Sequence, residues 1–308
     1  MADSGDNDWC LIESDPGVFT TMLEELGVSG VELAELWSLE DELLIELGKV
    51  HGLIFLFQWD KEKETAKAAN TNQLEEKDIP EDLFFAEQTT TNACATQAIL
   101  SVLFNAADLT AEQKGSTLAE FQSFTKEFPP NLKGVAISSS EEIKKIHNSF
   151  SRQDSFLQEG KTIVPTGNEE AFHFVAYVPV NGTVYELDGL QKGPIVVGEV
   201  PEEDGPIPAW LPVARKAIQE RMGVFGSTAI KFNLMAVIQD KRIGATDDVL
   251  AQEEVKRNEW KVENERRRHN YVPLCITMLQ ELAKMGELEQ LTQDAKERVA
   301  AKRAAKKG

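Results

Sequence analysis

The segment AFHFVAYVPVNGTVYELDGL constrains the fold more than any other part of the chain. An Asn-Gly pair between two apolar runs is the strongest short-range signal for a two-residue β-hairpin, so residues 172–180 and 183–187 are predicted to pair as antiparallel strands. In such a hairpin the numbers of any two paired residues add up to the same total as 181 and 182, so Val175 lies opposite Asp188. His173 then lies diagonal to Asp188 on one face, at roughly 7 to 8 Å between backbones and within side-chain reach. A bulge would shift this register.

This register gives the His173 and Asp188 pair a chemical use. A carboxylate there can accept one imidazole N–H, fix the tautomer and leave the other ring nitrogen for a nucleophile. Taken singly, His173 is equally consistent with a structural strand residue, and Asp188, which precedes Gly189, with a turn residue. Their placement on one face favours the functional interpretation.

The candidate nucleophile is Cys94, in the stretch FFAEQTTTNACATQAILSVLFNA. The apolar spacing after it predicts a helix, with Thr91 or Asn92 as the N-cap. A thiol in the first helical turn meets the positive end of the macrodipole, which favours the thiolate. Gln88, six residues earlier, can bring a side-chain amide to the same pocket as an oxyanion donor. The alternative is that Cys94 is a small buried hydrophobic residue.

Elsewhere the patterns predict alternating helices and strands. After the strand-like WCLIES, Asp15 is an N-cap with Pro16 at the first helical position, and a helical stretch follows. Trp37 to Glu40 opens a second helix, and residues 61–78 form a polar surface excursion. We further expect a buried central strand at 53–59, a strand at 232–238, and helices at 110–128 and 140–150. From 249 to 284 the sequence favours helix, with a break at Tyr271-Val272-Pro273.

Composition bounds the class of protein. A chain of 308 residues with 42% hydrophobic and 27% charged residues can bury one catalytic domain and carry an appendage. The three cysteines form no CxxC or Cys/His cluster, so we expect a reducing compartment and neither metal nor cofactor. No basic leader opens the chain and no run approaches about 18 apolar residues, so no membrane segment is expected.

The net charge of −20 is unevenly distributed. Residues 256–308 hold 13 Lys and Arg against 8 Asp and Glu, net +5, which leaves −25 on residues 1–255. An acidic body disfavours nucleic acid and suits a protein substrate with a basic face, although solubility alone also explains it.

Four strings are together characteristic of a known family. QTTTNACATQAILSVL, AFHFVAYVPVNGTVYELDGL, NDWCLIESDPGVFT and HGLIFLFQW resemble the ubiquitin carboxyl-terminal hydrolase family of cysteine deubiquitinases. The tail RRRHNYVPLCITMLQELAKMGELEQL resembles the extension of its larger, proteasome-associated subtype. The resemblance runs from about Asp8 to about Arg303 and shows no departure at the four candidate site residues.

The resemblance implies a fold and a site. The fold is α/β (α+β) of the papain-like cysteine protease type, with a central, mainly antiparallel sheet flanked by helices, a catalytic domain at 7–239 and a helical extension at 240–308. It makes Cys94 the nucleophile, His173 the general base and then acid, Asp188 the residue that orients His173, and Gln88 an oxyanion donor. The implied reaction cleaves ester, thioester, peptide or isopeptide bonds after the last glycine of ubiquitin through a thioester.

The resemblance also implies partners. Residues 256–308 are expected to dock on a proteasomal ubiquitin-receptor subunit and on a chromatin-remodelling complex. Their removal is expected to abolish proteasome association and to spare hydrolysis of a small ester. The composition, with no basic leader and no membrane segment, predicts that the protein resides in the cytoplasm and nucleus. An amphipathic segment that packs back on the body is the alternative for this tail. Residues 151–170 are expected to cross the active site as a gate, whereas an ordinary surface connection fits the same residues.

Two other function classes fit parts of the sequence. One is a catalytically idle ubiquitin-binding adaptor, which the intact set of four site residues disfavours. The other is a papain-like peptidase of different specificity, which would need an Asn or Asp partner elsewhere and gives the 151–170 segment no purpose.

Overall fold

The computed structural model describes residues 9–58, 72–151, 172–202, 205–224 and 232–305. The chain forms two compact units, of which the larger ends at Arg267 and the smaller runs from Arg268 onward. Most of the predicted surface excursion at 61–78 and nearly all of the predicted gate at 151–170 lie outside the described residues.

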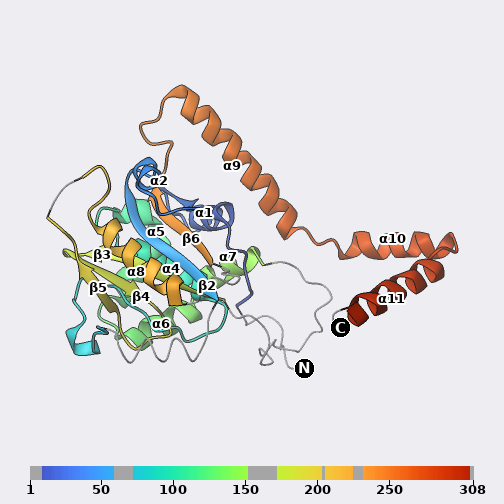
Figure 1. The fold of residues 1–308 in the computed structure, drawn as a ribbon, viewed down its shortest axis with the longest axis horizontal. Helices are drawn as coiled ribbons and strands as arrows, with labels where there is room; N and C mark the ends of the chain where they lie inside the picture. Colours follow the sequence, from blue (N-terminus) through green and yellow to red (C-terminus); the bar gives the residue numbers. More distant parts are fainter. Residues whose placement is uncertain (1–8, 59–71, 152–171, 203–204, 225–231, 306–308) are drawn as a thin grey trace. The chain divides into compact units, whose positions relative to one another are not determined.

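In its described residues, the larger unit is built on one six-stranded sheet, drawn in Figure 1. Its strands are β1 (Val31–Glu35), β2 (Val50–Gln58), β3 (Phe172–Val180), β4 (Thr183–Leu187), β5 (Ile195–Glu199) and β6 (Phe232–Gln239). They lie in the order β1-β6-β2-β3-β4-β5, and every neighbouring pair is antiparallel. The predicted antiparallel sheet is confirmed, with β2 in an interior position as the apolar run at 53–59 indicated.

The predicted hairpin is confirmed in its register. Val180 pairs with Thr183 and Ala176 with Leu187, so the two-residue loop sets the ladder as expected. Asn181 and Gly182 have φ values of 49° and 77°, the left-handed conformation that a type I′ turn requires at both central residues.

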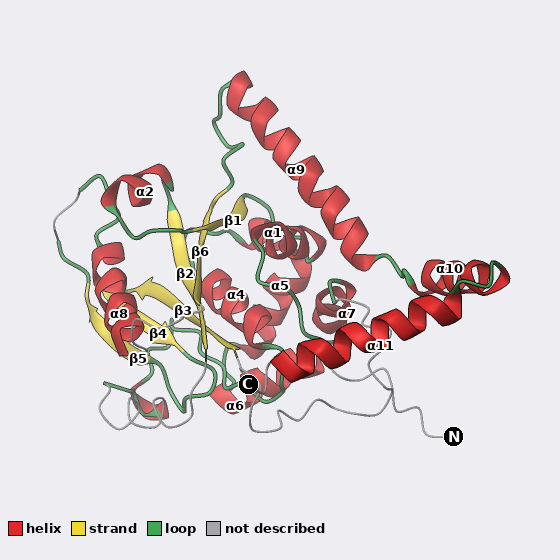
Figure 2. Ribbon diagram, turned by 45° about the vertical axis from the view of Figure 1, so that its right-hand side comes forward, coloured by secondary structure: helices red, strands yellow, loops and turns green. Residues whose placement is uncertain are grey.

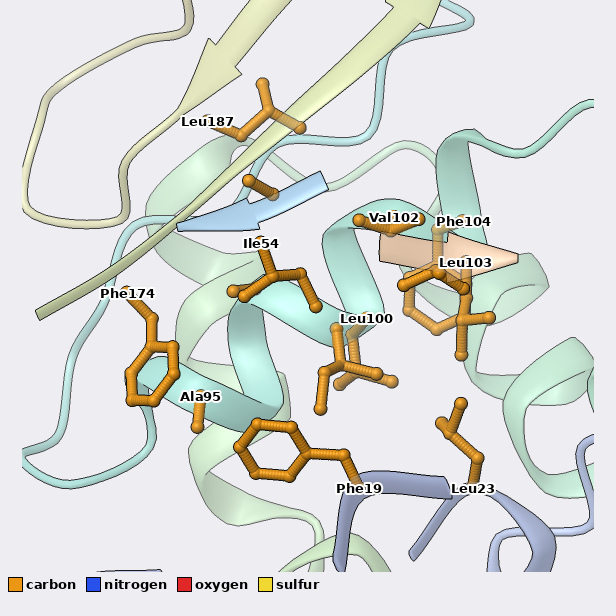
Figure 3. Packing of buried hydrophobic residues seen from close by; sticks show 14 of the residues in the cluster. Phe19, Leu23, Ile54, Ala95, Leu100, Val102, Leu103, Phe104, Phe174 and Leu187 are labelled. Atoms are coloured by element: carbon orange, nitrogen blue, oxygen red, sulfur yellow. The ribbon is translucent and has the colours of Figure 1, made fainter. Parts of the chain in front are cut away.

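Helices cover both faces of the sheet, as Figure 2 shows. In the larger unit they are α1 (Pro16–Glu25), α2 (Asp41–Glu46), α4 (Cys94–Asn105), α5 (Ala111–Thr125), α6 (Pro130–Ser139), α7 (Glu141–Ser149), α8 (Trp210–Val224) and α9 (Asp247–Arg268). One core cluster joins α4 and α1 to the sheet, and another joins α8 and α2 to its opposite face. Figure 3 shows the first of these, where Phe19 and Leu23 of α1 approach Leu100 and Leu103 of α4.

The helix predicted to start at Cys94 is confirmed and is buried along nearly its whole length. Asp15 caps α1 by accepting from the Val18 N–H at 2.9 Å, with Pro16 first in the helix as expected. The expected N-cap of α4 is wrong: Ala93 holds that position and no side chain caps the helix.

Two other expectations are corrected. WCLIES forms no strand, because its backbone bonds go to side chains, as where Cys10 N–H donates to Asn148 Oδ1 at 2.9 Å. The helical stretch expected after Pro16 is confirmed and ends at Glu25, and β1, which was not predicted, follows it at the sheet edge. The expected helix at 110–128 ends at Thr125, and α6 begins at Pro130.

Helix α9 packs on the sheet unit through one ring and several charges. A Cβ added to Gly17 of α1 would lie 2.6 Å from the Trp260 ring, so only a glycine admits this contact. Arg257 bonds Glu32 at 2.9 Å and Asp240 at 3.3 Å, and both carboxylates are buried. A cut at residue 256 would therefore remove contacts of the larger unit, which extends to Arg267. The division at 239 and 240 stays a prediction about function.

Where the structure describes it, the smaller unit consists of two helices, α10 (Val272–Lys284) and α11 (Leu288–Ala305). Large apolar side chains along it are exposed: Tyr271, Leu274, Ile276, Met278, Leu279, Met285, Leu291 and Val299. None of the helices in the described part of the chain is long and apolar enough to cross a membrane.

Candidate active site

Cys94 is the first residue of α4 and is half-buried. The first backbone bond within this helix runs from Gln97 N–H to Ala93 O at 2.8 Å. The Cys94 N–H precedes that bond and belongs to the set of donors that a helix start leaves free. Thiol and backbone donor thus lie together at the positive end of one helix. All three cysteines, Cys10, Cys94 and Cys275, are free thiols.

The start of α4 is held by residues from distant parts of the chain. Asn92 has a φ of 64°, and its side chain donates to Trp9 O at 3.0 Å. Thr96 Oγ1 lies 2.7 Å from His147 Nδ1, and His147 Nε2 lies 2.7 Å from Cys10 O. The carbonyl can only accept, so Nε2 donates and Nδ1 accepts from Thr96.

Burial keeps His147 neutral. Desolvation lowers the pKa of His147 to about 4, against the opposing effect of its bond to the Cys10 carbonyl. His147 is fully buried and braces the N-terminal segment against α4, a structural role that neither its spacing nor its neighbours in sequence predicted.

His173 and Asp188 meet as the hairpin register predicted. His173 Nε2 lies 2.6 Å from Asp188 Oδ1, and both side chains are buried. Burial alone would lower the pKa of His173, but its hydrogen bonds to Asp188 and Cys94 and their charges prevail and raise it to about 9. With Nε2 on the carboxylate, Nδ1 is the ring nitrogen that remains for Cys94.

Asp188 is itself fixed in place. Its Oδ1 also accepts from Leu190 N–H at 2.9 Å, which anchors the carboxylate to the turn after β4. Burial would raise the pKa of Asp188, yet the bonds to His173 and Leu190 and the charges of His173 and Arg221 lower it overall. The carboxylate is therefore ionised when it orients His173.

Gln88 lies beside Cys94 in a small cavity of about 10 Å³, which has room for roughly one water molecule. Its Nε2 donates to Thr90 O at 2.9 Å, which leaves the second N–H of the amide for another acceptor. Its Oε1 is buried and has no hydrogen-bond partner among the described residues. All four predicted residues are thus gathered at one end of the sheet, and their catalytic roles stay predictions.

A buried ion pair lies near His173, separated from it by the Phe57 ring, and was not predicted. Arg221 of α8 pairs with Glu186 of β4, and both side chains are almost fully buried. The Arg221 guanidinium lies 3.9 Å from the centre of the Phe57 ring, and that ring meets His173 edge-on with centroids 5.9 Å apart. Arg221 follows Gln219 and Glu220 in α8, and this polar run gives no sequence signal of a buried position. Among the described residues, no group of three or more His, Cys, Asp or Glu is placed to hold a metal ion.

Comparison with known proteins agrees with this geometry. Residues 9–223 match the family model described as ubiquitin carboxyl-terminal hydrolase, family 1, and residues 243–288 match a second described as ubiquitin carboxyl-terminal hydrolases. The chain is 36% identical over 353 residues to ubiquitin carboxyl-terminal hydrolase isozyme L5 of Dictyostelium discoideum, covering 96% of this chain and 97% of that one. It is 38% identical over 317 residues to ubiquitin carboxyl-terminal hydrolase ubh-4 of Caenorhabditis elegans, covering 96% and 93%.

A solved structure is also similar. The Trichinella spiralis UCH37 catalytic domain bound to ubiquitin vinyl methyl ester aligns with a TM-score of 0.61 at 39% sequence identity. The alignment covers 78% of this chain and 99% of that domain.

Proposed function

Since this chain belongs to the ubiquitin carboxyl-terminal hydrolase family, it is a cysteine-type deubiquitinase, and we propose that Cys94 is its nucleophile. The observation that carries this assignment is the 2.6 Å bond between His173 Nε2 and Asp188 Oδ1 beside a cysteine at a helix start. His173 Nδ1 takes the thiol proton, and the cationic imidazole then stabilises the thiolate.

The thiolate attacks the carbonyl carbon of the last glycine of ubiquitin, and the carbonyl oxygen becomes an oxyanion. The Cys94 N–H and the free N–H of the Gln88 amide stabilise that charge. His173 gives its proton to the leaving amine or alcohol, which departs as the thioester forms. Water, deprotonated by His173, then attacks the thioester and releases ubiquitin and the Cys94 thiol.

Labelling with ubiquitin that carries a C-terminal vinyl methyl ester tests the nucleophile. Mass spectrometry should find one adduct, on Cys94, absent from Cys94→Ala and slower to form in His173→Ala. Cys10→Ala and Cys275→Ala, the other two free thiols, should label at the parent rate. An adduct that persists in Cys94→Ala would overturn the assignment.

We further propose that the tail, residues 256–308, docks on a proteasomal ubiquitin-receptor subunit. The exposed apolar side chains of the smaller unit support this proposal, since large apolar side chains crowded in one short segment mark interaction sites. Within the tail, α9 up to Arg267 belongs to the larger unit. We therefore propose that the docking residues are the exposed apolar ones between 271 and 299. Met278→Asp should weaken capture by the purified receptor subunit, while Gln280→Asp, an exposed control on the same helix, should not. Equal capture of both variants would remove the docking role of α10.

The same tail is proposed to serve a chromatin-remodelling complex, with the protein present in cytoplasm and nucleus. Cell fractionation followed by pull-down of each fraction tests both statements. Recovery from the cytoplasm alone would contradict the nuclear role.

A further inference from the structure

One face of α4 carries buried polar side chains that the reaction above does not use. Gln97 and Asn105 stand three and eleven residues after Cys94, so helical periodicity places all three on the same side. Gln97 and Asn105 are 6% and 7% exposed. Buried amides of this kind require partners, and theirs identify what the face does.

Both amides hold the same backbone segment. Asn105 Nδ2 donates to Phe84 O, and Asn105 Oδ1 accepts from Phe84 N–H, each at 2.8 Å. Gln97 Nε2 donates to Ala86 O at 2.6 Å. The segment from Phe84 to Gln88 belongs to none of the six strands, so side chains of α4 supply bonds that a neighbouring strand would give.

Gln97 has a second neighbour. A Cβ added to Gly189 would lie 2.3 Å from Gln97 Nε2, so the turn after Asp188 rests directly on this amide. Gly189 O in turn accepts from the Gln88 N–H at 2.7 Å. Gln97 therefore lies where the Cys94 helix, the Gln88 segment and the turn after Asp188 converge, and it lines the cavity beside Cys94.

We propose that Gln97 is a positioning residue, which sets the distance between the Gln88 amide and the Cys94 N–H so that both reach one oxyanion. The inference rests on the proposed role of Gln88. The energetic reason is that oxyanion donors act only within about 3 Å of the developing charge, so that a displacement of about 1 Å costs on the order of a hundredfold in rate.

Gln97→Met tests the proposal, because it keeps the volume and removes the donor. With a ubiquitin C-terminal ester we expect kcat to fall about ten- to a hundredfold while KM changes less than about twofold. Asn105→Leu is the matched control, since it removes an anchor of the same segment from the same helix but does not line the cavity. Its kcat should stay within about threefold of the parent at a comparable loss of stability.

Two further readouts separate positioning from general damage. Alkylation of Cys94 by iodoacetamide forms no oxyanion, so its rate should be unchanged in Gln97→Met. In the Gln88→Ala background, Gln97→Met should cause no further loss of kcat, because its effect passes through Gln88.

The outcomes distinguish this inference from the proposed function. Full activity of Gln88→Ala would remove the oxyanion role of Gln88, and the inference with it. Loss of activity in Gln88→Ala together with a further, additive loss from Gln97→Met would overturn the inference alone. A slower alkylation in Gln97→Met, or an equal loss of kcat in Asn105→Leu, would also overturn it.

Discussion

Replacing Arg257 by alanine should destabilise the catalytic unit, although this residue lies beyond the predicted domain boundary. Its guanidinium bonds Glu24 at 2.8 Å, Glu32 at 2.9 Å and Asp240 at 3.3 Å. Glu32 is only 1% exposed, so water cannot replace the lost cation. Removing one partner of a buried ion pair costs about 3–5 kcal/mol when the other charge is left alone.

Glu32 is not left wholly alone, which sets the magnitude. Lys256 Nζ still lies 3.1 Å from Glu32 Oε1, although this lysine side chain is 30% exposed. We therefore expect Arg257→Ala to cost roughly 2–3 kcal/mol, a large part of the 5–15 kcal/mol typical of a domain. At an ordinary denaturant dependence the urea midpoint falls by about 1 M.

Urea unfolding of the full chain, followed by hydrolysis of a ubiquitin ester and by circular dichroism, measures this effect. Arg266→Ala is the control, because Arg266 is exposed on the same helix and the change in helix propensity is identical. Glu32→Gln in the Arg257→Ala background should recover part of the loss, since a neutral amide needs no counter-ion. Equal midpoints for Arg257→Ala and Arg266→Ala would refute the reasoning.

Three other predictions concern the active site and its supports. Burial would lower the pKa of His173, but its hydrogen bond to Asp188 prevails and raises it to about 9, so the imidazolium that pairs with the Cys94 thiolate is lost as pH rises through 9. We therefore expect kcat/KM to fall at that pH, and Asp188→Asn to move this alkaline decline to lower pH. An unchanged decline would count against the assignment of Asp188. The pKa of His147 is lowered to about 4 from its ordinary 6.5, so its contribution to stability is complete above pH 6.5 and lost as pH falls through 4. The free energy of unfolding, measured between pH 6.5 and 4, should fall in the parent by more than it does in His147→Gln. Gly189→Ala should lower kcat about tenfold or more, because its Cβ would lie 2.3 Å from Gln97. Gly223→Ala should not lower it, because no atom of the described residues lies within 4 Å of the added Cβ.

The parts of the fold that could be predicted are those with a local cause. Asn181-Gly182 dictates its own turn, and the turn dictates the pairing that brings His173 to Asp188. Asp15 and Pro16 start a helix by rules that involve only their neighbours. The Cys94 helix follows from its apolar spacing.

The parts that were missed depend on contacts distant in sequence. WCLIES has the composition of a strand, but Asn148 and His147 bind its backbone in place of a ladder. Asn92, expected to cap α4, donates instead to Trp9 O. The polar residues of α4 gave no hint that they hold the Gln88 segment, because that segment has no strand pattern of its own. Helix α9 docks through Trp260 and charges, so hydrophobic periodicity could not reveal it.

The two-residue turn between β3 and β4 makes chain length itself a determinant of activity. Side chains alternate between the faces of a strand, so one added residue that enters the ladder would turn His173 and Asp188 to opposite sides. A pair of residues added to β3 would preserve the faces and move Asp188 two further positions, about 7 Å, along the ladder from His173. A pair added to β4 would instead set Asp188 directly opposite His173. Exposed loop tips ordinarily tolerate insertions, but at Asn181 and Gly182 a single extra residue that enters the ladder would separate His173 from Asp188 while both remained in the sequence.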